Sequence, residues 1–357
     1  MSVARGFGLF VGVFVGTSIA ALAVAAIAAP WSRPRDVDLE VQGSPLPAAE
    51  SSGMTRQNVT VPRADGTSTQ GWLVLPTGVE PRRAVVLVAG AGASSRNDLI
   101  DLAGEFARHG VAALTVDKRA DASSALTRDF DRLADDVVDA GRFLRDFPAT
   151  GSSPVDVVGF SEGGWVAPRA AVVEPGLFAA VILVSPSIVS PLAQAAWVVD
   201  GAVAGATDSV RRVAAAAVAG GRAFGDYLDA DSDDALADLE IPVYAVWGAE
   251  DTSAPVASAA ARLSELVAAP VRRVILAGEG HNPSPHRWVA DALAWASDPD
   301  AAQGDPIRGV APTVVRAAPA PPPAAFYLDP RAHALAALTA ATAAVLSTHF
   351  RRKGHRP

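Results

Sequence analysis

Between about residue 57 and residue 297, short apolar runs alternate with amphipathic stretches. An apolar run of about four to eight residues between polar turns has the length of a buried strand, whereas apolar side chains spaced three or four residues apart mark one face of a helix. Such a helix is predicted where Phe130, Leu133, Val137, Val138, Phe143 and Leu144 recur at that spacing. Eight strands are predicted, near residues 58–62, 71–75, 84–89, 111–116, 155–159, 179–185, 242–247 and 272–277.

This alternation also predicts the fold class. Strands that alternate with helices along the chain form a mostly parallel sheet with helices on both faces. We therefore predict an α/β domain over residues 57–297, built on an eight-stranded, mostly parallel sheet. The interval between the sixth and seventh predicted strands, residues 190–240, is long and mostly helical in pattern, with glycines that interrupt it. It predicts a small helical insertion.

The N-terminal residues 1–30 differ sharply from this domain. Residues 6–29 form a stretch of 24 residues without a charged side chain, and the stretch is apolar on every face of a helix. It is long enough to cross a bilayer, and residues 26–28 also provide small residues suited to cleavage of a signal peptide. The segment therefore predicts either an uncleaved signal anchor or a signal peptide, and in both cases an exported chain.

Two linkers and a C-terminal segment are predicted around the domain. Residues 31–56 mix Pro, Ser, Gly and charge, and residues 298–330 include a Pro-rich run that favours extended backbone. Residues 331–357 contain a weakly apolar stretch followed by a basic tail. This stretch is either a second membrane span, which would leave the basic tail inside and the domain outside, or a surface helix.

Composition excludes several classes of function. The net charge is −8 and the central region has no basic stripe, so nothing favours a nucleic-acid partner. Cysteine is absent, which excludes disulfides, thiolate metal sites and a cysteine nucleophile. No spacing of His and acidic residues predicts a metal site. Gly90 and Gly92 lack the third glycine and the acidic residue of a dinucleotide loop, so no organic cofactor is predicted.

The strongest chemical signal is the sequence Gly-Phe-Ser-Glu-Gly at residues 159–163, which directly follows a predicted strand and leads into a predicted helix. In this context the serine of a G-x-S-x-G motif lies on a sharp strand-to-helix turn with its hydroxyl exposed at the edge of the sheet. Ser161 is therefore a candidate nucleophile.

Two further residues follow predicted strands in the order that a catalytic triad requires. Asp251 comes just after the strand near residues 242–247, and His281 comes just after the strand near residues 272–277. The carboxyl ends of parallel strands meet at one edge of the sheet, so Ser161, Asp251 and His281 are predicted to meet there.

These motifs resemble those of the α/β-hydrolase fold family, in its branch of serine esterases, thioesterases and peptidase-like enzymes. Residues 116–119, Val-Asp-Lys-Arg, are similar to the D-x-R-G stretch that follows the fourth strand in this family. The chain departs from the family pattern at Ala120, at residues 89–92 and at Phe160, where Gly, a His-Gly pair and His are common. The resemblance implies that the insertion at residues 190–240 is a lid over the site; helices packed on the sheet are the alternative.

The roles of the candidate residues follow from their chemistry. A serine hydroxyl needs a base, for which His281 is the best placed histidine, and Asp251 would orient it, with the adjacent Glu250 as a competitor. An oxyanion hole needs two backbone N–H donors. We expect these from Glu162, directly after the nucleophile, and from Ala91, with Gly92 as a second possibility.

The sequence thus predicts a serine hydrolase that cleaves a small-molecule ester or thioester through an acyl-enzyme on Ser161. A serine peptidase or an acyltransferase would use the same triad. A membrane-anchored, non-catalytic binding domain is a further alternative, although a binding protein has no physical need for Ser161, Asp251 and His281 together.

Overall fold

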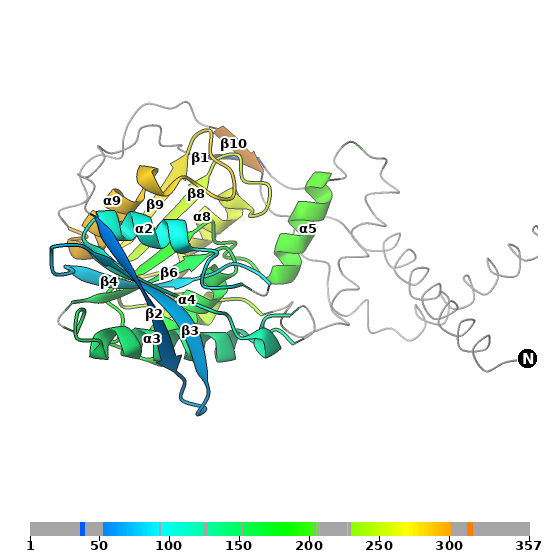
Figure 1. Cartoon of the computed structure of the whole chain (residues 1–357). Helices are drawn as coiled ribbons and strands as arrows, with labels where there is room; N and C mark the ends of the chain where they lie inside the picture. The colour runs from blue at the N-terminus through cyan, green and yellow to red at the C-terminus, as the bar shows by residue number, and fades with distance from the viewer. Residues whose placement is uncertain are drawn as a thin grey trace, which may run out of the picture. The chain divides into compact units, whose positions relative to one another are not determined.

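The computed structural model describes residues 36–39, 53–92, 94–124, 127–151, 153–202, 205, 207, 227, 230–300 and 313–316. The chain divides into two compact units, of which residues 35–194 and 224–318 form the larger. The fold described below is that of the larger unit, shown in Figure 1. Helix α5 (Pro191–Ala202) crosses the boundary between the units.

The larger unit is built on an eight-stranded sheet in the order β2-β3-β5-β4-β6-β7-β8-β9. The strands are β2 (Met54–Pro62), β3 (Ser68–Pro76), β4 (Arg83–Val88), β5 (Val111–Val116), β6 (Val155–Phe160), β7 (Val181–Val184), β8 (Val243–Gly248) and β9 (Val271–Leu276). β3 pairs antiparallel with β2 and with β5, whereas all pairs from β5 to β9 are parallel. The predicted eight-stranded, mostly parallel sheet is therefore confirmed.

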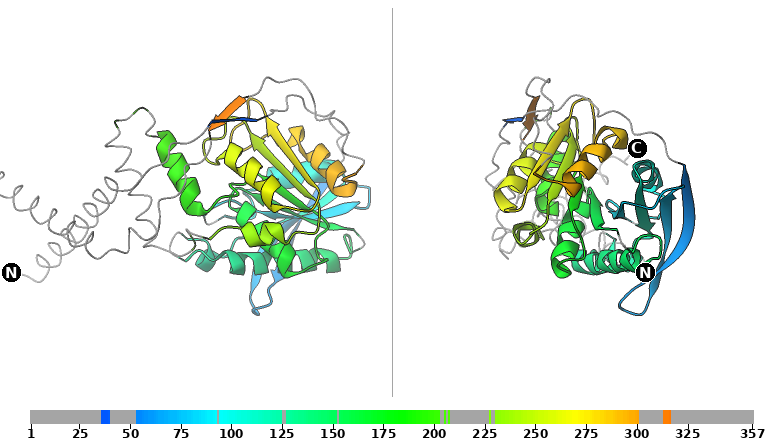
Figure 2. Two further views of the ribbon diagram at one scale, coloured as in Figure 1. Left: turned by 180° about the vertical axis from the view of Figure 1, so that it is seen from behind. Right: turned by 90° about the vertical axis from the view of Figure 1, so that its left-hand side faces the viewer.

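Helices cover both faces of this sheet, as Figure 2 shows. α2 (Ile100–Arg108) and α9 (Val289–Ser297) pack on one face, where Phe106 meets Trp288 edge to face at 6.1 Å between ring centroids. The other face carries α3 (Phe130–Asp146), α4 (Gly163–Val173), α7 (Asp233–Ala237) and α8 (Val256–Leu266).

The central strands are apolar on both sides because each side faces a layer of helices. In β4, Val86 packs in the cluster under α3 and α4, while its neighbours Val85 and Leu87 pack under α2 and α9. This strict alternation explains why the strands appear in the sequence as continuous apolar runs rather than as alternating ones.

A buried ion pair joins β4 to β6 at the start of the two strands. Arg83 Nε donates to Asp156 Oδ2 at 2.6 Å, and a second guanidinium nitrogen donates to Oδ1. The carboxylate is fully buried and the guanidinium nearly so. Burial raises the pKa of Asp156, and the guanidinium of Arg83 opposes this shift.

Residues at the ends of the larger unit form a second, small sheet. β1 (Asp36–Leu39) pairs antiparallel with β10 (Thr313–Arg316), although both strands lie within segments that the sequence predicts to be linkers. β2 also begins at Met54, slightly before the predicted domain boundary at residue 57.

The predicted signal segment at residues 1–30 and the apolar stretch at 331–357 lie outside the described residues. Within the 190–240 insertion, the same holds for most residues between 203 and 229. α5 and α7 are the described helices of that insertion. Within the described residues, we find no helix of the length and apolarity that a membrane span needs.

Removing one partner of the Arg83–Asp156 pair is expected to destabilise the fold strongly. Asp156→Ala leaves a buried guanidinium unpaired, which costs about 3–5 kcal/mol of unfolding free energy. Replacing both partners, by Arg83→Met together with Asp156→Leu, should cost far less because no buried charge is left. Urea denaturation measures both. An Asp156→Ala variant as stable as the parent would show that the pair contributes little.

Candidate active site

Ser161 lies on a sharp turn between β6 and α4. Its φ is +52°, a value that is strained for a residue with a side chain. Its N–H donates to Val184 O at 2.8 Å and its carbonyl accepts from Gly164 N–H at 2.9 Å, so the turn is fixed on both sides. A Cβ at Gly159 would lie 2.3 Å from Gly163 O, which is why the residue before the end of β6 must be glycine. The turn leaves the serine hydroxyl beyond the carboxyl end of the sheet.

The structure brings the three predicted triad residues together in one hydrogen-bonded chain. Ser161 Oγ lies 2.9 Å from His281 Nε2, and His281 Nδ1 lies 2.9 Å from Asp251 Oδ2. Asp251 follows β8 and His281 follows β9, and these strands are neighbours in the sheet. The arrangement allows Nδ1–H to donate to the carboxylate while Nε2 accepts from the serine hydroxyl.

The carboxylate of Asp251 is completely buried, and its second oxygen is also satisfied. Oδ1 accepts from Ser253 N–H at 2.7 Å and from Ala254 N–H at 2.9 Å. These bonds fix the side chain so that Oδ2 faces His281. The neighbouring Glu250, considered above as a competitor, instead joins the two loops through its backbone N–H, which donates to Glu279 O at 2.9 Å.

Close packing between two loops holds the histidine in place. A Cβ at Gly248, the last residue of β8, would lie 2.2 Å from the carbonyl oxygens of Glu279 and Gly280. The backbone that leads into His281 thus rests directly on the end of the neighbouring strand. On its other side the imidazole lies 5.5 Å from the ring of Phe160, measured between centroids.

The two predicted oxyanion donors lie on loops that approach the nucleophile. Glu162 is the N-cap of α4, and N–H groups at a helix start have no partner inside the helix. Ala91 follows Gly90, where a Cβ would be 3.4 Å from Ser161 Cβ. The loop after β4 therefore passes alongside the serine. The role of both N–H groups in binding an oxyanion remains a prediction.

The sequence did not predict which charges pair with Glu162 in a buried cluster next to this turn. The side chain of Glu162 is almost fully buried and forms ion pairs with Lys118 and with Arg128, the latter at 2.9 Å. The Lys118 ammonium also donates to Gly90 O at 2.7 Å. The sequence did contain one signal of this cluster: Glu162 is an ionisable residue at the start of the apolar helix α4. A charge buried at such a position requires a partner.

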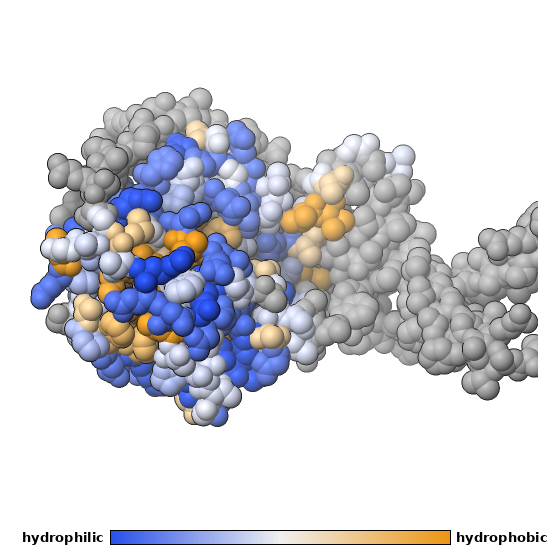
Figure 3. Space-filling view, in the orientation of Figure 1, coloured by the Kyte–Doolittle hydropathy of each residue, from blue (hydrophilic) through white to orange (hydrophobic). Residues whose placement is uncertain are grey.

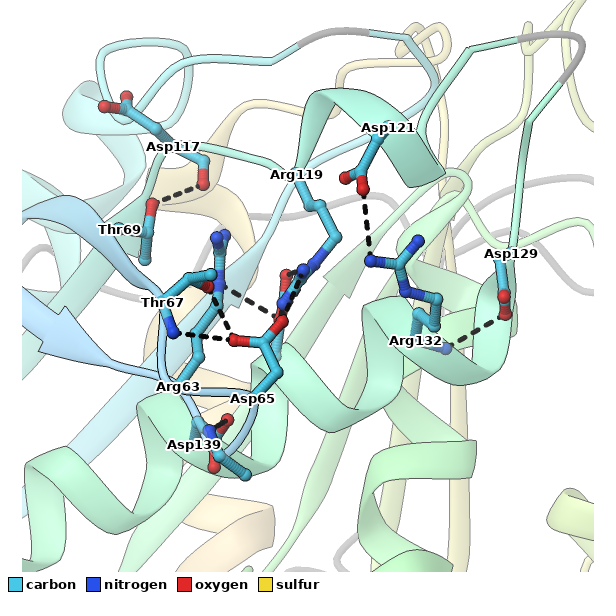
Figure 4. A network of polar contacts seen from close by, with 12 residues as sticks. Arg63, Asp65, Thr67, Thr69, Asp117, Arg119, Asp121, Asp129, Arg132 and Asp139 are labelled. Carbon is cyan, nitrogen blue, oxygen red and sulfur yellow. Dashed lines mark hydrogen bonds and ion pairs between the residues drawn. The ribbon is translucent and has the colours of Figure 1, made fainter.

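The neighbouring Asp117 and Arg119 brace loops rather than line the site. Arg119 forms a bidentate pair with Asp136 on α3 and a bond of 2.7 Å with Asp65, which ties the turn between β2 and β3 to the helix (Figure 4). Asp117 accepts from Arg96 N–H at 2.8 Å. These contacts give Asp117 and Arg119 structural roles.

A groove of about 310 Å³ lies between β2 and α2, on the face that Figure 3 shows, where hydrophilic residues surround smaller hydrophobic areas. It is lined by Met54, Arg56, Val74, Ile100, Asp101, Gly104 and Arg108, and so by no residue of the triad. In the described part of the chain, no three His or acidic side chains are grouped as metal ligands would be.

Comparisons with known proteins find matches to part of the sequence. Residues 43–198 match the family described as Esterase FrsA-like. The polyketide transferase ATR5 of Stachybotrys chlorohalonatus is 33% identical over 150 residues, which are 40% of this chain and 50% of that protein. The chain thus spans about half the length of this curated relative.

Solved structures agree on the fold. The alpha/beta hydrolase GrgF from a Penicillium species superposes with a TM-score of 0.51 at 21% identity, over 68% of this chain and 97% of that one. Dipeptidyl peptidase 4 of Porphyromonas gingivalis gives a TM-score of 0.50 at 16% identity, over 70% of this chain and 36% of that one. At such identities the likeness shows the fold, and it confirms the one predicted from the sequence.

Gly248→Ala is expected to displace the histidine loop and to lower activity. The added methyl group overlaps two carbonyl oxygens, so the backbone before His281 must move, and a shift of about 1 Å at a reacting group can cost about 100-fold in kcat/KM. Gly280→Ala is the matched control, because a Cβ there meets nothing within 4 Å. Ester hydrolysis by both variants measures the difference. Equal activity in the two variants would contradict the assigned role of the loop contact.

Proposed function

Because the chain has the α/β-hydrolase fold, we propose that it is a serine hydrolase that cleaves carboxylic esters or thioesters through an acyl-enzyme on Ser161. The observation that carries the proposal is the chain of two hydrogen bonds, each 2.9 Å long, from Ser161 through His281 to Asp251. Serine is a weak nucleophile at neutral pH, and a base within hydrogen-bond distance is what activates it.

In the acylation step, Ser161 Oγ attacks the substrate carbonyl while His281 Nε2 takes the hydroxyl proton. Asp251 holds the imidazole in the required tautomer and stabilises the imidazolium that forms. The negative oxygen of the tetrahedral intermediate is bound by the N–H groups of Glu162 and Ala91. The intermediate expels the alcohol or thiol, which takes the proton from His281.

In the second step, water attacks the acyl-enzyme with His281 as base, and the acid and the free serine are released. An acceptor other than water would give transfer instead of hydrolysis with no change in these residues. The similarity to a polyketide transferase over 150 residues favours an acyltransferase as the second candidate. The match to the esterase family over residues 43–198 favours hydrolysis.

Two alternatives have less support. A serine peptidase would use the same triad, and here the support is a shared fold with a dipeptidyl peptidase at 16% identity. A non-catalytic binding domain would not need Ser161 in a strained conformation, nor a fully buried carboxylate aimed at a histidine. Strain of this kind occurs mainly where function requires it.

Ser161→Ala is expected to abolish turnover of p-nitrophenyl esters by the full-length chain. The loss should reach about 10⁴-fold or more in kcat, because the substitution removes the nucleophile. The chain-length optimum of the ester series measures the acyl pocket. A fluorophosphonate probe should label the parent protein and not the variant.

If the parent protein neither hydrolyses any ester nor reacts with the fluorophosphonate, the serine hydrolase proposal is wrong, and the binding-domain alternative takes its place. If both proteins hydrolyse the esters equally, the nucleophile is a different residue. Addition of a competing alcohol or thiol distinguishes the two enzyme candidates: a transferase converts the acyl-enzyme mainly to the new ester, whereas a hydrolase releases mainly the acid.

A further inference from the structure

Lys118 occupies an unusual position for a lysine, since its side chain is buried behind the nucleophile turn. It directly follows the loop-bracing Asp117 after β5, and only 8% of its side chain is exposed. Its ammonium group has two partners on two different segments: the backbone carbonyl of Gly90, at 2.7 Å, and the carboxylate of Glu162. Burial lowers the pKa of Lys118, while the carboxylate of Glu162 opposes this shift.

The bond to Gly90 acts on the predicted oxyanion donor Ala91 through a single peptide group. The carbonyl of Gly90 and the N–H of Ala91 belong to the same planar unit, and the described chain contains no cis peptide bond. In a trans peptide the C=O and N–H point in opposite directions. A hydrogen bond that fixes the carbonyl of Gly90 therefore fixes the direction of the N–H of Ala91, and a charged donor also polarises that amide.

The second partner brings the same ammonium group to the other predicted donor. Glu162 supplies its backbone N–H at the start of α4, and its carboxylate returns to Lys118. Arg128 contacts this carboxylate at 2.9 Å from the other side. Its described contacts are with Glu162, Ser123 O and the Tyr227 ring.

We propose that Lys118 is a positioning residue for the oxyanion hole. Its ammonium group joins the peptide group of Ala91 to Glu162, the residue that supplies the second donor. The inference rests on the proposed function, because an oxyanion forms only if Ser161 attacks a carbonyl. Packing alone does not require this charge, since an apolar side chain fills buried space without the cost of desolvating an ammonium group. The contact with Gly90 does require a donor.

The test compares Lys118→Met with Arg128→Met in the full-length protein. Both variants remove one cation from Glu162, but only Lys118→Met removes the bond to Gly90. Loss of one oxyanion donor costs about 100- to 1,000-fold in kcat, and a donor that is present but poorly held should cost less. We expect Lys118→Met to lower kcat by about 10- to 100-fold with KM changed less than threefold.

Arg128→Met should change kcat less than threefold. Affinity for a trifluoromethyl ketone, which forms a tetrahedral oxyanion on the serine, should fall in parallel with kcat in Lys118→Met. Lys118→Arg, which keeps a charged donor, should recover part of the loss. Thermal unfolding of each variant separates a local effect from loss of the fold. If Lys118→Met does not fold, the triple variant Lys118→Met, Glu162→Gln and Arg128→Met, which leaves no charge in the cluster, replaces it.

Each outcome decides the question. Equal effects of Lys118→Met and Arg128→Met, or a change in KM alone, overturn the inference and leave the serine hydrolase proposal intact. A parent protein that is inert towards esters and towards the fluorophosphonate overturns the proposed function and this inference with it. A selective loss of kcat and of ketone affinity in Lys118→Met supports both.

Discussion

Direct contact of backbone with backbone at two strand ends is the constraint on which the candidate site depends. The carbonyl of Gly163 lies where a side chain of Gly159 would be, and the carbonyl of Glu279 lies where a side chain of Gly248 would be. The first contact sets the turn that presents Ser161. The second sets the loop that carries His281. A hydrogen bond of 2.9 Å between two residues 120 positions apart is possible because neither loop is held off by a side chain.

Buried charge is used at both ends of the central strands, with different consequences. At the start of β4 and β6, Arg83 and Asp156 satisfy each other in a bidentate pair that holds two neighbouring strands in register. At the opposite end, Glu162 is shared between Lys118 and Arg128. Apolar residues could replace the first pair at little cost, because it makes no contact with the site. In the second cluster Lys118 also contacts the backbone carbonyl of Gly90, beside the nucleophile, so its replacement affects geometry as well as stability.

Local signals explain which features the sequence could predict. The central strands were visible as apolar runs, and Ser161, Asp251 and His281 were visible because each follows its own strand. The pairing of β1 with β10 was not visible, since four-residue strands far apart in the chain leave no periodicity. The ion-pair partners of Glu162 could not be predicted either. Lys118 is 44 residues away, and sequence spacing contains no information about which distant charge pairs with a buried carboxylate. The predicted donors Glu162 and Ala91 lie near the serine, but their chemical role awaits measurement.

The two tasks of the proposed serine hydrolase would fall to different residues, which meet at one peptide bond. In the proposed reaction, the proton would be handled by the hydrogen-bonded chain from Ser161 through His281 to Asp251, on the side of the sheet formed by β8 and β9. The negative oxygen would be handled on the other side, by backbone groups held through Lys118. Ser161 belongs to the residues that handle the proton, and Glu162 to those that would bind the negative oxygen. A substitution at Lys118 should therefore leave the hydrogen bonds of His281 intact and still weaken binding of the transition state. This result is expected because the geometry of the oxyanion donors and the transfer of the proton depend on different side chains.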